Sequence, residues 1–327
     1  MLCFRTIEYF IFRTDQTVIG EAFIHKLSGI LLLGISISLF RYSWTKVGFS
    51  PVKVFRNILL GALLGTAVFT VGYGIEILIQ SSTGNFSGLK FYVTSYSLLG
   101  NRGMQSNLLF IMICIAGNMI NVIMEEGVFR GLFVRLAEEK YSFPVACILS
   151  SVLFGVWHIM QPLRNVIDGN QSMAGAFMAG LILVVTSTLL GIQYCMLYKL
   201  TGSLWAGMTA HFVNNTTANL LHVVTSSGVD ELLSVRITIA QTLSFLIVLF
   251  FYISRNRKNR SHPCGRNENN LLKQTTEDNM PKNNDNNSMF TTNYIKHIDM
   301  GLRKWYFVII KNVFVKGISC NTSKMKC

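Results

Sequence analysis

The stretch MEEGVFRG, residues 124–131, directly follows a long apolar run. Two carboxylates and an arginine therefore adjoin a segment of the length of a membrane helix, where a charged group is costly. On a helix, Glu126 and Arg130 have the i,i+4 spacing that favours an ion pair. Glu125 lies about 100° around the helix from Glu126, so we expect it to point elsewhere, unpaired, as a general base would. Alternatively, both glutamates could simply end a helix at an interface that solvent reaches.

The composition is that of an integral membrane protein. Of the 327 residues, 50% are hydrophobic and only 14% are charged, and the mean hydropathy is positive. These values lie outside the range of ordinary soluble domains. We predict an all-α, polytopic membrane helical bundle with seven transmembrane helices, or eight if LCFRTIEYFIF at the start also enters the membrane. The expected spans are about 24–40, 58–80, 107–124, 143–160, 174–198, 203–224 and 236–253.

The net charge is +13, and the basic residues are distributed between the predicted spans as in a membrane protein rather than along one binding face. Basic residues gather after the first, third and seventh spans, and these clusters share one side if all seven segments cross. By the positive-inside rule that side is cytoplasmic, so the expected partner is the lipid bilayer and not nucleic acid. Three cations, Arg5, Arg13 and Lys26, fall on the opposite side and leave the topology of the first 30 residues open.

The chain divides by composition. Residues 1–23 form an N-terminal segment that could associate with the membrane, and residues 24–254 form the membrane domain. Residues 255–302 are rich in Asn and charge, so we expect a disordered linker on the cytoplasmic side. Residues 303–327 combine basic and apolar residues, as in RKWYFVIIKNVFVKGI. This tail resembles a segment lying on an anionic membrane surface, with an unstructured tail as the alternative.

Two further polar groups interrupt the predicted spans. His158 ends the segment FGVWH, with Phe154 one turn earlier on the same face. His211 and Asn215 in HFVNN are spaced i,i+4 and share a helix face, with Asn214 as an i,i+3 alternative. A single histidine in an apolar helix is often a packing residue, and a His–Asn pair can be only a hydrogen-bonded clasp between helices.

Together these positions supply the groups for hydrolysis. If they converge, Glu125 and His158 can hold and deprotonate a water molecule. His211 and Asn215 can then donate hydrogen bonds to the oxyanion that develops on a scissile carbonyl. Alternatively, Glu125, His158 and His211 could bind zinc and leave a position for water. The chain has no HExxH motif, so the familiar metalloprotease geometry is absent.

Three motifs carry a family resemblance. EEGVFR (125–130), FGVWH (154–158) and HFVNN (211–215) resemble, in order and approximate spacing, the EExxxR, FxxxH and HxxxN motifs of the CPBP intramembrane proteases. This family is also called the Abi or type II CAAX endopeptidase family. Each motif alone is weak, but the three together are specific. The resemblance implies a helical membrane fold with a catalytic cavity inside the bilayer that opens toward the cytoplasm.

The resemblance also implies roles for the motif residues. Glu125 and His158 would activate water, and His211 and Asn215 would form the oxyanion site. Of the remaining motif residues, Glu126 and Arg130 would support the structure or orient substrate, and Phe154 would support the second motif. The family has been described both as metal-dependent and as glutamate-dependent. We expect a glutamate mechanism with no cofactor, and zinc on the three side chains named above is the alternative.

The expected function is that of an intramembrane endopeptidase that hydrolyses a peptide bond of a membrane-associated protein or small peptide. The Asn- and Lys-rich tail is typical of a low-GC bacterium, which favours a multi-pass protein of a bacterial plasma membrane. Bacterial relatives are associated with peptide maturation, bacteriocin immunity and signalling-peptide processing. The main alternative is a non-catalytic immunity or scaffold protein of the same fold, although no motif residue is lost. A transporter with a proton relay is disfavoured by the lack of internal repeats. Oligomeric state has no signature in the sequence.

Overall fold

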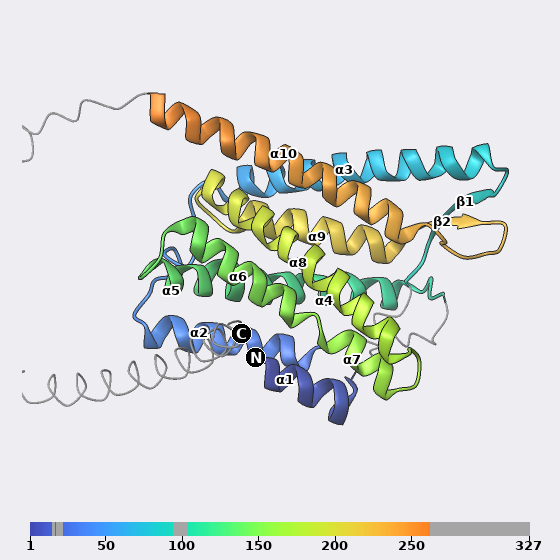
Figure 1. Ribbon diagram of the computed structural model, residues 1–327, viewed down its shortest axis with the longest axis horizontal. Helices are drawn as coiled ribbons and strands as arrows, with labels where there is room; N and C mark the ends of the chain where they lie inside the picture. The colour runs from blue at the N-terminus through green and yellow to red at the C-terminus, as the bar shows by residue number, and fades with distance from the viewer. Residues whose placement is uncertain (15–16, 18–21, 94–103, 262–327) are drawn as a thin grey trace, which may run out of the picture. The chain divides into compact units, whose positions relative to one another are not determined.

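The computed structural model describes residues 1–14, 17, 22–93 and 104–261. These residues are mostly helical and belong to one unit, Met1–His262 (Figure 1). The predicted tail, 303–327, and nearly all of the predicted linker lie outside the described residues.

Five helices in the described part of the chain are long and apolar enough to cross a membrane. The all-helical membrane fold is therefore confirmed. Two of these spans are composite, because the chain continues in helical form from α4 through η3 into α5, and from α6 toward α7. The five spans are α3 (Val54–Ser82), α4 (Leu108–Glu125) with η3 (Glu126–Phe133) and α5 (Val134–Glu138), α6 (Phe143–Trp157) with α7 (Met160–Ile167), α8 (Met173–Thr201) and α10 (Leu233–Ser261).

The remaining elements are shorter. They are α1 (Leu2–Ile7), η1 (Glu8–Phe12), α2 (Ile24–Leu39), β1 (Phe86–Phe91), α9 (Trp205–Leu220) and β2 (Leu221–Thr225). Two of the seven predicted spans, 24–40 and 203–224, correspond to α2 and α9, which have 16 residues each. That is fewer than the roughly 20 residues a helix needs to cross a bilayer. The span predicted at 203–224 is divided because the backbone becomes extended at Leu221 and continues as β2.

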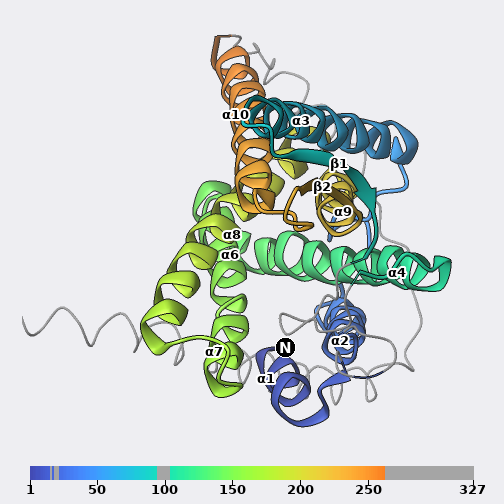
Figure 2. The same ribbon diagram turned by 90° about the vertical axis from the view of Figure 1, so that its right-hand side faces the viewer.

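The helices pack in layers around α4. Figures 1 and 2 show α3 and α10 together on one side, with α9 between α3 and α4. On the other side of α4 lies α2, while α6 packs along α8. This arrangement brings the three helical segments that carry the motifs, η3, α6 and α9, toward one another.

A small sheet joins two distant parts of the chain. Strand β1 pairs antiparallel with β2, and Phe86 lies opposite Thr225. These strands were not predicted from the sequence. Beside them lies a group of ionisable side chains, called here the sheet cluster, in which Glu76, His222 and Arg236 are buried and Asp230 is partly buried. Its contacts connect α3, β2 and α10.

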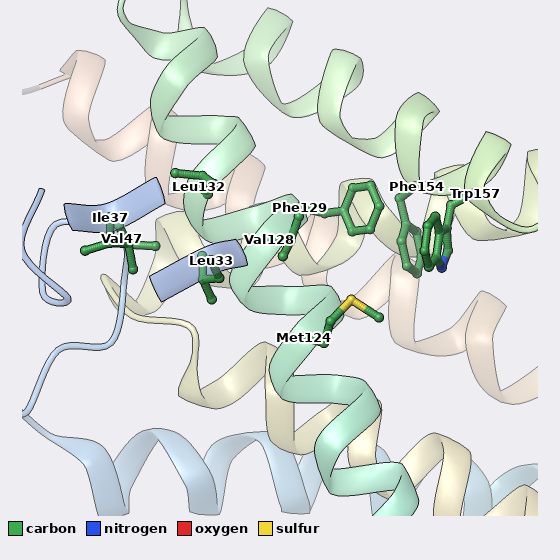
Figure 3. Close-up of a cluster of buried hydrophobic side chains, with 9 residues drawn as sticks. All are labelled: Leu33, Ile37, Val47, Met124, Val128, Phe129, Leu132, Phe154 and Trp157. Atoms are coloured by element: carbon green, nitrogen blue, oxygen red, sulfur yellow. The ribbon is translucent and has the colours of Figure 1, made fainter. Parts of the chain in front are cut away.

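An apolar cluster fixes η3 against its neighbours. Figure 3 shows side chains from α2, from the loop after it, from η3 and from the end of α6 packed together. Full burial of a large apolar side chain contributes about 1.5–3 kcal/mol. Gly131 permits the close approach, since a Cβ there would lie 2.7 Å from the Val47 carbonyl oxygen. The cluster contains Leu33, Ile37, Val47, Met124, Val128, Phe129, Leu132, Phe154 and Trp157.

Two of the three N-terminal basic residues that fall on the non-cytoplasmic side of the predicted topology have partners within the protein. Arg5 is buried, donates a hydrogen bond to the carbonyl oxygen of Trp157 at 2.8 Å and lies over the Trp157 ring. Arg13 forms an ion pair with Asp168 beyond α7. These charges have partners within the protein, so they do not count as free positive charges in a topology argument.

At the other end of the described chain, α10 extends to Ser261. Residues 255–261, predicted as the start of the linker, are therefore helical.

Candidate active site

The EEGVFR motif lies where the helix changes type. Glu125 is the last residue of α4, and Glu126 begins the π-helix η3. A π-helix closes its hydrogen bonds from residue i to i+5 and has a wider turn than an α-helix; such segments are frequent at functional sites. The α-helical angles used to predict where the two glutamates point therefore do not apply beyond Glu125.

Glu126 is shared between two basic partners. Its Oε1 atom lies 2.9 Å from His211 Nδ1 and 3.4 Å from Arg130 Nη1. All three side chains are buried. The predicted Glu126–Arg130 ion pair is thus confirmed. Since the carboxylate only accepts hydrogen bonds when ionised, Nδ1 of His211 carries the hydrogen in this contact.

As predicted, Glu125 takes no part in the Glu126–Arg130 ion pair, and its neighbour lies on another helix. Glu125 is buried, and its Oε2 lies 3.7 Å from His211 Nε2. That separation is too long for a hydrogen bond but short enough for charges to interact. Both glutamates thus approach the same imidazole, each from a different ring nitrogen.

Arg130 is buried between aromatic rings. Its guanidinium carbon lies 3.9 Å from the centre of the Phe154 ring and 5.5 Å from that of Tyr194. Tyr194 in turn stacks on the His211 ring at 5.0 Å. Arg130 is 0% exposed, yet none of its three nitrogens makes a hydrogen bond to the part of the chain that the structure describes. The ring faces and the ion pair with Glu126 are its only recorded stabilising contacts among those residues.

His158 follows the last turn of α6 and is partly buried. Its Nδ1 lies 2.8 Å from the carbonyl oxygen of Phe154. Because a carbonyl oxygen only accepts, Nδ1 must carry a hydrogen, and Nε2 of the neutral ring is then an acceptor. The rings of His158 and His211 both lie against the Phe154 ring, and Glu125 lies beside His211. Glu125 and His158 therefore offer two proton acceptors in one region.

Asn215 is one turn from His211 on α9. Its Oδ1 accepts a hydrogen bond from Asn214 Nδ2 at 3.0 Å, so its own amide nitrogen remains a donor. The side-chain oxygen of Asn214 accepts from Gln241 Nε2 at 3.4 Å. Asn214, held as an alternative to Asn215, is thus occupied as a link to α10.

The structure brings most of the predicted residues into contact. Direct contacts join Glu125, Glu126, Arg130, Phe154 and His211, and His158 is attached through Phe154. Within the described chain, the side chain of Asn215 makes no hydrogen bond or ion pair with either glutamate.

Sequence reasoning missed two residues beside the site. Tyr194 has no sequence signal, because a tyrosine in an apolar span is ordinary. Arg5 was noted only as a problem for topology, although a cation in a membrane-associated segment could have prompted a search for a buried partner.

A zinc site does not fit this arrangement. Among the described residues, no three His, Cys, Asp or Glu side chains are placed to hold a metal ion. We therefore derive no step through a metal.

The comparisons with known proteins agree with the motifs. The family model for Type II CAAX prenyl endopeptidase Rce1-like proteins matches residues 107–217. This range contains all three motifs, so the family resemblance is confirmed for this part of the chain. No curated protein matches the chain.

Proposed function

Because residues 107–217 match the type II CAAX endopeptidase family, we propose that this membrane protein hydrolyses a peptide bond with a water molecule activated by Glu125 and His158. The observation that carries the proposal is the buried cluster of two glutamates around His211, next to His158. Clusters of buried titratable groups are costly and concentrate at functional sites, above all within membranes.

In the proposed reaction, Glu125 removes a proton from water while the water oxygen bonds to the scissile carbonyl carbon. Nε2 of neutral His158 is an acceptor and holds the same water. The C–N bond then breaks, and the proton taken by Glu125 passes to the leaving nitrogen. A protein general base of this kind typically contributes about 10²–10⁴-fold to the rate.

The oxyanion would be stabilised by His211 and Asn215. The side-chain nitrogen of Asn215 is a donor that its neighbours leave available. His211 donates Nδ1 to Glu126, so Nε2 can donate only when the ring is the imidazolium. Glu126 and Arg130 then act as positioning residues for His211, which is a more specific form of the supporting role expected for them.

The proposed substrate is a small peptide or a membrane-associated protein, and the proposed location is a bacterial plasma membrane with the C-terminal tail in the cytoplasm. Five membrane-length helices and a site on the central helices support a substrate that reaches the site within the bilayer. Prenylated C-terminal peptides, named in the family description, are the first substrates to compare with unprenylated ones.

The decisive experiment compares wild type with Glu125→Gln in detergent, on a prenylated fluorogenic peptide and on a library of unprenylated peptides, with and without chelator. Glu125→Gln should lower kcat about 10³-fold, since it removes the base but keeps the side-chain shape. It should leave folding intact, because Glu125 has only a 3.7 Å contact with His211.

The matched control is Glu139→Gln, which changes an exposed carboxylate at the end of the same helical span. Cleavage should be retained in that variant. Full activity of Glu125→Gln would contradict the proposal. Loss of wild-type cleavage in the presence of chelator would instead indicate that Glu125, His158 and His211 bind a metal ion. A well-folded wild type that cleaves no substrate would favour the non-catalytic immunity or scaffold protein.

A further inference from the structure

A set of uncharged polar side chains lies between the helices next to the candidate active site. Gln193 of α8, Asn214 of α9, and Gln241 and Ser244 of α10 line a cavity of about 10 Å³, together with the rings of Phe69 and Tyr194. A cavity of that size accommodates roughly one water molecule and is too small for a peptide side chain.

The lining has hydrogen-bonding capacity that the protein leaves unused. Gln193 donates to Ser244 Oγ at 2.7 Å, and Gln241 donates to Asn214 at 3.4 Å. Within the described residues, no hydrogen bond reaches the side-chain oxygens of Gln193 and Gln241, and the Ser244 hydroxyl donates to no acceptor. The cavity therefore offers two acceptors and one donor, a set that suits a water molecule.

The setting makes an empty cavity unfavourable. Gln193 and Ser244 belong to membrane-length helices and are 3% and 6% exposed, so a polar atom there without a partner costs several kcal/mol. Asn214 and Gln241 are partly exposed. A bound water that makes two to four hydrogen bonds would remove this cost.

The cavity also connects to the residues of the proposed reaction. Tyr194 lines the cavity and stacks on the His211 ring. Asn214 lines it and donates to Asn215, the proposed oxyanion residue. Water held here would be separated from the site by one layer of side chains.

We propose that this cavity is a water site that supplies the hydrolytic water to a catalytic centre surrounded by lipid. The supply role rests on the proposed peptidase function, whereas the presence of water does not. The recognition chemistry is that of the two glutamine amides and the serine hydroxyl, none of which belongs to the three sequence motifs.

The test measures hydration and turnover separately. Hydroxyl radicals generated by X-ray pulses from bound water oxidise the side chains that touch it. In wild type, Tyr194 and Phe69 should be oxidised as fast as side chains exposed to solvent. Gln241→Leu removes the amide and fills the space, so it should suppress oxidation of Tyr194. It should also lower kcat roughly tenfold and leave KM unchanged, because peptide binding does not use the cavity.

Two variants serve as controls on the same helix. Gln241→Asn keeps an amide and should keep Tyr194 oxidation and most of kcat. Thr238→Val changes an exposed residue of α10 away from the cavity and should change neither quantity.

Slow oxidation of Tyr194 in wild type would overturn the inference and leave the proposed peptidase standing. Lost oxidation in Gln241→Leu with unchanged kcat would overturn the supply role. A hydrated cavity in a protein that cleaves nothing would overturn the peptidase together with the supply role, but not the water site.

Discussion

Two arginines in this protein are both 0% exposed, but their surroundings differ. Arg236, in the sheet cluster, donates hydrogen bonds to Glu76 and to Asp230, whose Oδ2 lies 2.6 Å from Arg236 Nη2. Arg130, in the candidate site, has one carboxylate neighbour at 3.4 Å and no hydrogen bond within the described chain. Arg236 Nε and Glu76 Oε1 also lack hydrogen-bond partners among the described residues, but the other two guanidinium nitrogens of Arg236 are bonded to carboxylates, whereas all three nitrogens of Arg130 are unbonded. The candidate site thus retains more hydrogen-bonding capacity, as functional sites do.

The surroundings of the two clusters fit this difference. Nδ1 of His222 in the sheet cluster donates to Asp230 Oδ2 at 2.9 Å, and the His222 ring stacks on Tyr92 at 4.0 Å. Its groups mostly bind one another. In the candidate site, His211 lies between two carboxylates, and a charge on the ring is needed if both nitrogens are to donate. The comparison leads to three predictions that remove one partner at a time.

The largest effect is expected for Glu126→Gln. This change leaves Arg130 buried without its only carboxylate ion-pair partner among the described residues, which should lower the free energy of unfolding by roughly 3–5 kcal/mol. The yield of folded protein should fall, and equilibrium unfolding in mixed detergent micelles measures the loss. Glu125→Gln is the matched control and should remain close to wild type. Equal losses in the two variants would contradict the division of labour between the glutamates.

A smaller effect is expected for Glu76→Gln in the sheet cluster. Arg236 keeps Asp230 as a charged partner in this variant, and glutamine can still accept a hydrogen bond. The loss should be about 1–2 kcal/mol, the cost of weakening one charged hydrogen bond. The same unfolding measurement decides the point. A loss as large as that of Glu126→Gln would show that the second carboxylate does not compensate.

The smallest effect is a pH dependence from Asp230, in the loop before α10. Burial opposes its charge, but hydrogen bonds with His222 and Arg236 outweigh burial and hold the pKa of Asp230 below the usual 3.8. A carboxylate whose pKa is lower in the folded than in the unfolded state stabilises the folded state. This contribution is complete at pH values above the unfolded-state pKa and is lost as the pH falls through the folded-state pKa.

We therefore expect the unfolding temperature to fall below about pH 4. Asp230→Asn should reduce that slope, although it also lowers stability at neutral pH. An unchanged slope in Asp230→Asn would assign the acid sensitivity to other carboxylates.

Hydropathy and motif spacing predicted much of the molecule. The five long spans follow from apolar runs, because a bilayer requires roughly 20 residues of helix. The Glu126–Arg130 pair follows from its spacing. The convergence of η3, α6 and α9 was assumed for the proposed chemistry rather than predicted from the sequence. These features depend on local sequence or on the requirement to bury polar groups.

Other features depend on tertiary contacts and could not be read from the sequence. The π-helix that begins at Glu126 has no sequence signature. The β1–β2 pairing joins segments more than 100 residues apart, which no local pattern indicates. By contrast, Glu76 lies inside the predicted span 58–80, so the search for ionisable groups within spans could have found it.

The wide turn that begins at Glu126 has one more consequence. A π-helix is equivalent to an α-helix with one extra residue in its turn. Deleting one residue from the Glu126–Phe133 segment would restore the α-helical phase and rotate everything before it by about 100° relative to everything after it. The angular relation between Glu125 and Arg130 is therefore encoded in the number of residues between them as well as in their chemical type.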